Sequence, residues 1–296
     1  MQAWTVSIRW AVAAVLGVTA LAVWVPSGLL LLLFLGVVIS AHEAGHLLVA
    51  RRAGMVPTEY YWGFGPEIVA YQGPTCRYGL RVAFVGGYVK IHGMTPSSDI
   101  PDDFDESGTF RAASARGRLA TIIAGPAVNL SMAVVAFAVA ALLEGAGPAA
   151  ALTAGVGDVW FVTAGTADAL GTWVANLGQY FQAVADPGAA QAPVRFMSPV
   201  AQAEVSAVAV SGGLVSTLRW FAILSTAVGV INLLPLPPLD GSHAVVAAVD
   251  GLLGRLRPGG RARVDVSRLV PLAYVTVGAL VVLSVSALVL DLRDLT

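Results

Sequence analysis

Two histidines and a glutamate form the segment of this sequence whose residue types and spacing best fit catalysis. The segment His42-Glu43-Ala44-Gly45-His46 places the histidines four residues apart, with the glutamate beside the first. On a helix, residues i and i+4 lie on one face, so both imidazoles can reach a single metal ion. The neighbouring carboxylate can then act as a general base on a water molecule beside that ion. The pattern predicts His42 and His46 as metal ligands and Glu43 as the catalytic base.

The residues around this pattern place it inside a membrane. Leu29–Ala50, taken as one helix, is long enough to cross a bilayer. Ionisable groups within such a helix are energetically expensive, so their presence indicates a function rather than a chance match. The helix then ends at Arg51-Arg52-Ala53-Gly54, whose paired arginines indicate the cytoplasmic side of the membrane.

A second polar cluster follows a later apolar run, Arg219–Leu234. It begins at Asn232 and reaches Asp240-Gly241 after three prolines, which break a helix because they lack a backbone donor. Unwound backbone at membrane depth is tolerated only beside protein or a water-filled cavity. A turn in a cytoplasmic loop would by itself account for the Asp-Gly pair. Together with the first motif, however, Asp240 supplies a third, anionic ligand, and two histidines plus one carboxylate form a catalytic zinc arrangement with one open position.

Composition places the whole chain among membrane proteins. Its 296 residues are 57% hydrophobic and 12% charged, against about 25% charged residues in soluble domains. We therefore expect an α-helical polytopic membrane protein with about five to six transmembrane helices. The net charge of −1 and the lack of a basic stripe with interleaved aromatics argue against a nucleic-acid partner. The single cysteine, Cys76, excludes a disulfide framework and a cysteine-cluster metal site.

The segments between the predicted spans differ in character. Ile8–Val25 is interpreted as a retained first span, although Ala20-Leu21-Ala22 also has the form of a signal-peptide cleavage site. Tyr60–Met94 contains short β-type runs punctuated by Gly86-Gly87, and we expect a β-hairpin or sheet there. This sheet is either a cytoplasmic hairpin or a membrane re-entrant element that brings a free strand edge toward the metal.

We expect three regions along the chain. Residues 1–143 form an N-terminal membrane core, and residues 216–296 form a C-terminal membrane core that ends in the span Leu269–Leu290. Residues 144–215 form an extracytoplasmic or interfacial segment with one or two amphipathic helices. In the predicted span Leu119–Leu143, Gly125 and Pro126 permit close packing or a kink. Asn129 in the same span needs a hydrogen-bond partner. It either forms a hydrogen bond between helices or lies near the reacting groups.

Together these motifs resemble the site-2 proteases, a family of intramembrane zinc metalloproteases. The resemblance covers most of the chain outside residues 145–213, and the segments at residues 51–55, 63–66 and 92–96 are similar to the actinobacterial branch. Many bacterial members carry one or two PDZ domains in the stretch matched here by residues 144–215, which lacks a convincing PDZ pattern. The residues that carry the resemblance are His42-Glu43-Ala44-Gly45-His46, Gly86-Gly87-Tyr88-Val89-Lys90, Ala124-Gly125-Pro126-x-x-Asn129 and Asn232-Leu233-Leu234-Pro235-x-Pro237-x-Leu239-Asp240-Gly241.

The resemblance implies a role for each of these motifs. One zinc ion would be held by His42, His46 and Asp240, with Glu43 as the general base. The region around Gly86-Gly87 would belong to a membrane re-entrant β-loop. Substrate or the transition state would be held by Gly86, Gly87, Asn129 and Asn232.

The function that follows is hydrolysis of peptide bonds within transmembrane segments, at an inner or plasma membrane and toward its cytoplasmic side. The partner would be a single-span membrane protein, such as an anti-sigma factor, whose unwound segment pairs with the sheet edge near Val85–Ile91. The alternative is a proteolytically inactive zinc-binding membrane scaffold, for which Glu43 would have no use. We expect His243 to support the site and His92 to be unrelated to the metal. The sequence names neither the substrate nor the oligomeric state.

Overall fold

The fold was analysed in a computed structural model that describes residues 4–24, 26–94, 100–101, 104–186, 188, 194–256 and 269–294. These residues group into two compact units, each built from three stretches of chain. The first unit comprises Met1–Ala20, Leu35–Asn129 and Ile231–Tyr274. The second unit comprises Leu21–Phe34, Leu130–Val230 and Val275–Thr296. Every predicted site residue belongs to the first unit.

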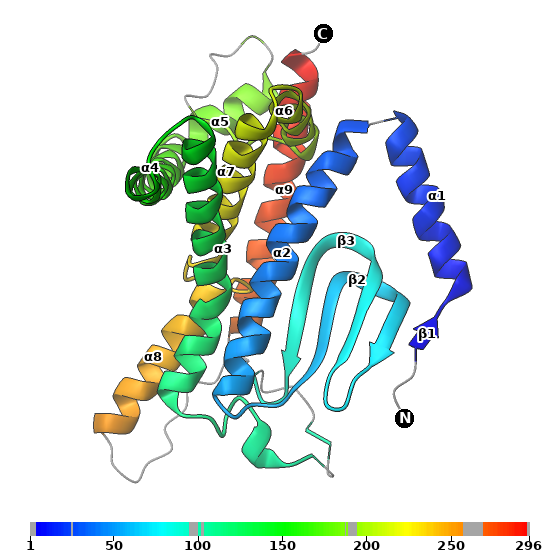
Figure 1. The fold of residues 1–296 in the computed structure, drawn as a ribbon, viewed down its shortest axis with the longest axis vertical. Coiled ribbons are helices and arrows are strands. Elements are labelled where there is room, and N and C mark those ends of the chain that lie inside the picture. The colour runs from blue at the N-terminus through cyan, green and yellow to red at the C-terminus, as the bar shows by residue number, and fades with distance from the viewer. Residues whose placement is uncertain are drawn as a thin grey trace. The chain divides into compact units, whose positions relative to one another are not determined.

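Long apolar helices dominate the described chain and confirm the class of polytopic helical membrane protein (Figure 1). Four helices among the described residues are long and apolar enough to cross a membrane, fewer than the five to six expected. They are α2 (Pro26–Arg52), α3 (Ala115–Leu143), α7 (Leu214–Asn232) and α9 (Val270–Asp294).

The segment predicted as a first span is not among these four helices, and its role as a span stays a prediction. The segment is helical as α1 (Ile8–Trp24), but its 17 residues rise only about 26 Å, short of the roughly 30 Å of a bilayer's hydrocarbon core. Val25, where the predicted span ends, lies outside the described residues.

The second unit is helical throughout its named elements. It contains α4 (Pro148–Ala175), α5 (Leu177–Ala185) and α6 (Pro199–Ser211) in the region where amphipathic helices were expected. A core of Ala133, Ala136, Phe137, Val159 and Ala222 joins α3, α4 and α7.

The region predicted as β-structure is a sheet in the first unit, which confirms that prediction. β2 (Pro57–Gln72) pairs antiparallel with β3 (Arg77–Ile91), and β1 (Trp4–Val6), which the sequence did not reveal, pairs with β2. The strands are longer than the short runs expected, because both bend instead of ending. At the bend in β2, Gly63 has φ 92°, and a Cβ there would lie 2.6 Å from the Arg81 carbonyl oxygen. Only glycine accepts both conditions without strain.

The sheet packs beside α2, as Figure 1 shows. Tyr60 Oη donates to the Ser40 carbonyl oxygen at 2.7 Å. A Cβ on Gly36 would touch the Trp62 ring at 2.7 Å, so this glycine lets the strand approach the helix closely. These contacts hold the sheet against the part of α2 that leads into the histidine pair.

The rest of the first unit closes one end of α2. A buried core of Ala50, Met55, Ile91, Phe110, Ile122 and Ala247 joins the end of α2 to the end of β3, the start of α3 and α8 (Asp240–Leu256). The short helix η1 (Glu106–Gly108) lies in the connection to α3 and is capped by Asp105, whose carboxylate accepts from Ser107 N–H. The core therefore sets the spacing of α2, α3 and α8, which carry the predicted site.

An ion pair on the sheet ties its three strands together. Arg77 on β3 donates to Glu67 on β2 at 2.8 Å and to Thr5 on β1 at 2.7 Å. Tyr61 Oη donates to the same carboxylate at 2.6 Å. Hydrogen bonds from Arg77 lower the pKa of Glu67 to about 2, because they stabilise the ionised carboxylate.

We expect this carboxylate to stabilise the fold in a pH-dependent way. A depressed pKa contributes stability that is complete above the unfolded value near 4.5 and is lost as the pH falls toward about 2. Replacing Glu67 with Gln should cost about 1 kcal/mol at pH 7, the upper range for a partly exposed pair. Thermal unfolding in detergent at pH 7 and pH 3 would measure the difference. A gap between wild type and variant that is the same at both pH values would contradict this assignment.

Candidate metal centre

Three potential metal ligands from two helices meet in the first unit. His42 and His46 lie one turn apart on α2, and Asp240 is the first residue of α8. Asp240 Oδ2 lies 2.9 Å from His42 Nε2 and 3.2 Å from His46 Nε2, and the two Nε2 atoms are 3.1 Å apart. No other cluster of three or more His, Cys, Asp or Glu among the described residues could hold a metal ion. The ligand set predicted from the sequence is thus assembled by the fold.

The donor set and its spacing fit zinc. A tetrahedral ion with bonds of 2.0–2.1 Å has ligand atoms roughly 3.3–3.4 Å apart, close to the 2.9–3.2 Å that separate these three atoms. The pair of imidazoles and one carboxylate leaves the fourth position of such an ion open. His42 is buried, and Asp240 is half-buried, so its carboxylate keeps limited access to solvent.

The carbonyl of Thr121 on α3 fixes the orientation of His46. His46 Nδ1 lies 2.7 Å from this oxygen, which can only accept a hydrogen bond. The Nδ1 atom must therefore carry the proton, and the Nε2 lone pair is free to bind a metal. Thr121 contributes only its backbone carbonyl, so no side-chain type at this position could have predicted the contact.

Asn129, also on α3, contacts the other histidine. This fully buried amide places its terminal nitrogen 3.1 Å from His42 Nδ1. If His42 binds a metal through Nε2, its Nδ1 atom carries the proton and needs a hydrogen-bond acceptor. The Asn129 amide can provide one by turning its oxygen toward Nδ1, because the oxygen and nitrogen of an amide can be exchanged in assignment. The sequence predicted Asn129 as a substrate contact. The structure brings it against a metal ligand, which it can orient.

Glycines let the helices approach closely enough to form the centre. A Cβ on Gly125 would collide with both Nε2 atoms, at 2.6 Å from that of His42. A Cβ on Gly45 would lie 2.7 Å from the Ala124 carbonyl oxygen. A Cβ on Gly241 would run into the carbonyl oxygens of the preceding loop, at Leu233 and Leu234. The sequence predicted only that Gly125 permits close packing or a kink. The structure shows that the groups packed against it are the imidazoles of His42 and His46.

Glu43 lies between the ligands and the sheet. Its carboxylate lies near the backbone of Val89 on β3. A Cβ on Gly87 would lie 3.1 Å from Glu43 Cγ, so this glycine also borders the predicted base. A Cβ on Gly86 would instead meet the Phe64 ring at 2.6 Å, so this position adjoins an aromatic side chain of β2.

The remaining predicted residues occupy less central positions. Asn232 is the half-buried last residue of α7, eight positions before Asp240. His243 lies in the first turn of α8, partly buried and outside the ligand cluster. His92 packs edge-on against Phe104 with ring centroids 4.6 Å apart and is not part of the cluster. The supporting role predicted for His243 stays a prediction.

The fold and the site define a class: a helical membrane protein with a His-His-Asp cluster that could hold a metal ion. The chain belongs to peptidase family M50, whose model matches residues 30–273. This match confirms the resemblance to the site-2 proteases.

Individual relatives match over shorter stretches. A putative zinc metalloprotease of Clostridium acetobutylicum is 35% identical over 114 residues, which are 38% of this chain and 32% of the relative. Zinc metalloprotease Rip1 of Mycobacterium tuberculosis is 35% identical over 107 residues, 36% of this chain and 26% of Rip1. Zinc metalloprotease RasP of Oceanobacillus iheyensis is 43% identical over 65 residues, which are 22% of this chain and 15% of RasP. The chain thus spans about a third or less of the curated relatives it matches.

The close contact at Gly125 yields a test of the centre. Gly125→Ala should lower zinc affinity at least tenfold, because the added methyl group displaces both imidazoles and positional changes around ligands commonly cost 10–100-fold. Zinc retained against a competing chelator would measure the effect. Gly165→Ala is the matched control, since a Cβ at Gly165 in α4 meets nothing within 4 Å. Equal zinc affinity in the two variants would count against the proposed metal position.

Proposed function

We propose that this protein is an intramembrane zinc metalloprotease that hydrolyses peptide bonds within transmembrane segments. One observation supports the proposal most: the Glu43 carboxylate lies between a His-His-Asp ligand set and the backbone of a β-strand. A general base, a metal site with an open position and a surface that can bind extended backbone are the parts that peptide hydrolysis requires.

The ligands and the base divide the chemistry between them. Zinc held by His42, His46 and Asp240 would supply Lewis-acid polarisation of the scissile carbonyl and of the attacking water. Glu43 takes the proton of that water and delivers it to the leaving amine. Thr121 and Asn129 hold the two imidazoles in place, so that little reorganisation accompanies the reaction.

The sheet offers a place for an unwound substrate segment. A peptide taken out of its helix leaves N–H and C=O groups without partners, at a cost of several kcal/mol each in lipid. Pairing with a strand edge satisfies those groups. Val89, which is paired with Tyr60 of β2, lies on the β3 segment next to Glu43. A strand added along Gly87–Ile91 would pass beside the base.

The partner we propose is a single-span membrane protein, for which an anti-sigma factor is the type suggested by the family. The side of the membrane follows from charge. Arg51 and Arg52 end α2 five and six residues after His46, so the centre lies roughly 8 Å along the helix axis from the basic end. We propose that this end faces the cytoplasm, because cytoplasmic flanks carry an excess of arginine and lysine.

Substitution of the base tests the activity. Glu43→Gln should reduce cleavage of a tagged single-span substrate to background, because glutamine cannot accept the proton, and general-base catalysis typically contributes 10²–10⁴-fold. Zinc content of the same purified samples should stay near that of wild type, since Glu43 is not a ligand. Wild-type rates of cleavage by the glutamine variant would refute the mechanism.

The strand edge is tested separately at Gly87. Gly87→Ala places a methyl group 3.1 Å from Glu43 Cγ and 3.0 Å from the Tyr61 carbonyl oxygen, so the neighbouring groups must shift by a few tenths of an ångström. We expect cleavage to fall roughly tenfold, because small misplacements of reacting groups are costly, while zinc content is unchanged. A variant that loses zinc in parallel with activity would show that Gly87 supports the metal centre rather than the substrate path.

A further inference from the structure

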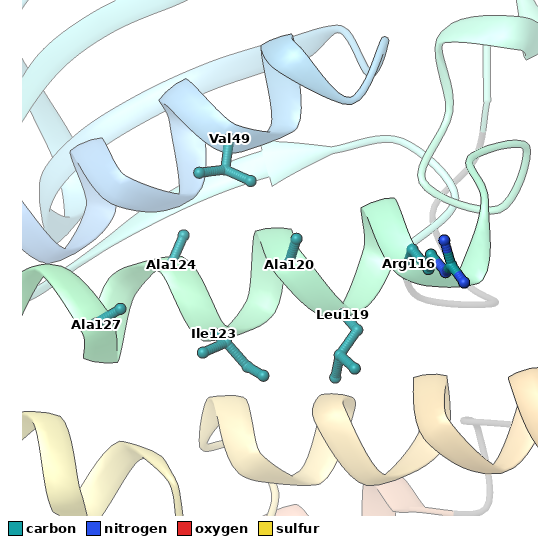
Figure 2. Close-up of a pocket in the computed structure, with 7 residues that line it drawn as sticks. All are labelled: Val49, Arg116, Leu119, Ala120, Ile123, Ala124 and Ala127. Atoms are coloured by element: carbon teal, nitrogen blue, oxygen red, sulfur yellow. The ribbon is translucent and has the colours of Figure 1, made fainter.

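A shallow apolar groove, lined by residues of α2 and α3, lies in the first unit (Figure 2). Its volume is about 510 Å³. Three alanines of α3, at positions 120, 124 and 127, lie on one face of the helix because they are spaced by four and three residues. Their small side chains leave the hollow, and Val49 of α2 borders it. Ile123 and Leu119 complete its apolar wall, and Arg116 closes one end.

A second arginine lies at the same end of the groove. Arg52 follows Val49 by three residues and Gly45 by seven, so it shares the face of α2 that meets α3. The two helix ends are adjacent, since a Cβ on Gly117 would lie 3.2 Å from Ala53 Cβ. Arg116 lines the groove, and Arg52 is on the adjacent helix end; both side chains are exposed.

Among the described residues, these two arginines differ from their neighbours in having no side-chain partner. Arg51 donates to the Tyr78 hydroxyl. Arg111 pairs with Glu106 at 2.9 Å, and Arg118 pairs with Asp250 at 3.0 Å. In the part of the chain that the structure describes, neither Arg52 nor Arg116 has an acidic partner or a side-chain hydrogen bond. An anion bound at this end of the groove would give Arg52 and Arg116 the partner that they lack.

We propose that the groove binds one acyl chain of an anionic phospholipid, whose phosphate lies between Arg52 and Arg116. Guanidinium groups bind phosphate by charge-assisted, paired hydrogen bonds, and anionic lipids are attracted to basic residues at helix ends. From Arg116 to Ala127 the groove extends roughly 16 Å along α3, which suits an extended hydrocarbon chain.

A protein helix fits the groove less well than a lipid chain. A helix about 10 Å in diameter would lie only on the surface of this shallow groove and would need an acidic group of its own to pair with the arginines. A soluble anion would use the arginines but leave the apolar floor exposed. The lipid uses both features.

The bound chain would lie directly behind the metal centre. Ala124 in the groove floor precedes Gly125, the residue in contact with both histidines, and the Ala124 carbonyl faces Gly45 of α2. Lipid in the groove would therefore stabilise the α2–α3 contact that holds the ligands. The binding itself involves neither Glu43 nor the metal, so it can be tested without any measurement of proteolysis.

The test is native mass spectrometry of the full chain, titrated with phosphatidylglycerol in detergent. We expect one tightly retained phosphatidylglycerol per chain and weaker retention of phosphatidylcholine. The double substitution Arg52→Gln with Arg116→Gln should weaken binding about thirtyfold, or about 2 kcal/mol, since each basic residue near an anionic lipid contributes about 1 kcal/mol. Arg111→Gln, which removes an arginine already paired with Glu106, is the matched control and should bind as wild type does.

A groove-filling variant separates this site from general surface charge. Ala120→Trp keeps both arginines but fills the hollow, and it should lower phosphatidylglycerol retention at least tenfold without changing zinc content. Undiminished retention in Ala120→Trp would overturn the groove assignment and leave only headgroup attraction. Equal weakening by Arg111→Gln, or equal thermal stabilisation by inorganic phosphate and by the lipid, would likewise overturn it. A change from one oligomeric state to another in the double variant, without lipid loss, would instead identify the groove as a contact between copies.

Discussion

The structure depends on holding three polar ligands together within apolar helices. Asp240 reaches His42 across 198 residues of sequence, and the two lie 2.9 Å apart. Buried polar groups are costly unless they are paired or bound to a metal. The helices must therefore meet with little tolerance, and the glycines at the contact explain how they do so. Gly45 and Gly125 on the facing sides of α2 and α3 have no side chain where backbone or imidazole atoms lie within 3 Å.

α3 is the element that most directly supports the centre. It provides no metal ligand, yet its Thr121 carbonyl and Asn129 amide contact the outer nitrogens of the two histidines. Hydrogen bonds of this kind fix the tautomer and the ring plane of a ligand. On its outer side the same helix carries the alanine-lined groove. A change in the packing of α3 would therefore shift the groups that orient His42 and His46.

The sheet adds a second constraint, because it places the backbone of β3 next to the predicted base. Hydrogen bonds and aromatic contacts hold β2 against both strands and against α2, and the network of Glu67 and Arg77 links all three strands. The edge at Val89 therefore has a defined position relative to Glu43. Extended substrate backbone next to a rigid edge would be oriented before reaction, which is where much of the catalytic advantage of a binding site arises.

The sequence by itself determined the class of the protein and predicted the three residues that the fold brings together as a possible metal site. Apolar length predicts spanning helices, and helical periodicity places His42 and His46 on one face, since both are local properties of the chain. The prolines before Asp240 marked the break in the helix for the same reason. The β-region could be recognised from its residue types, but β1 could not, because three residues carry too weak a pattern.

Only the tertiary structure decided what each supporting residue contacts. Asn129 was predicted to hold substrate or the transition state, and its side chain lies against His42. The contact of His46 with the Thr121 carbonyl could not be predicted, because it does not depend on the side chain at position 121. Gly86 and Gly87 are adjacent in sequence, but Gly86 adjoins Phe64 and Gly87 adjoins Glu43. Such contacts join residues far apart in the chain and depend on the packing of whole helices and strands. A local sequence pattern can predict the candidate ligands of a site. The contacts that orient those ligands form only when the helices and strands pack together.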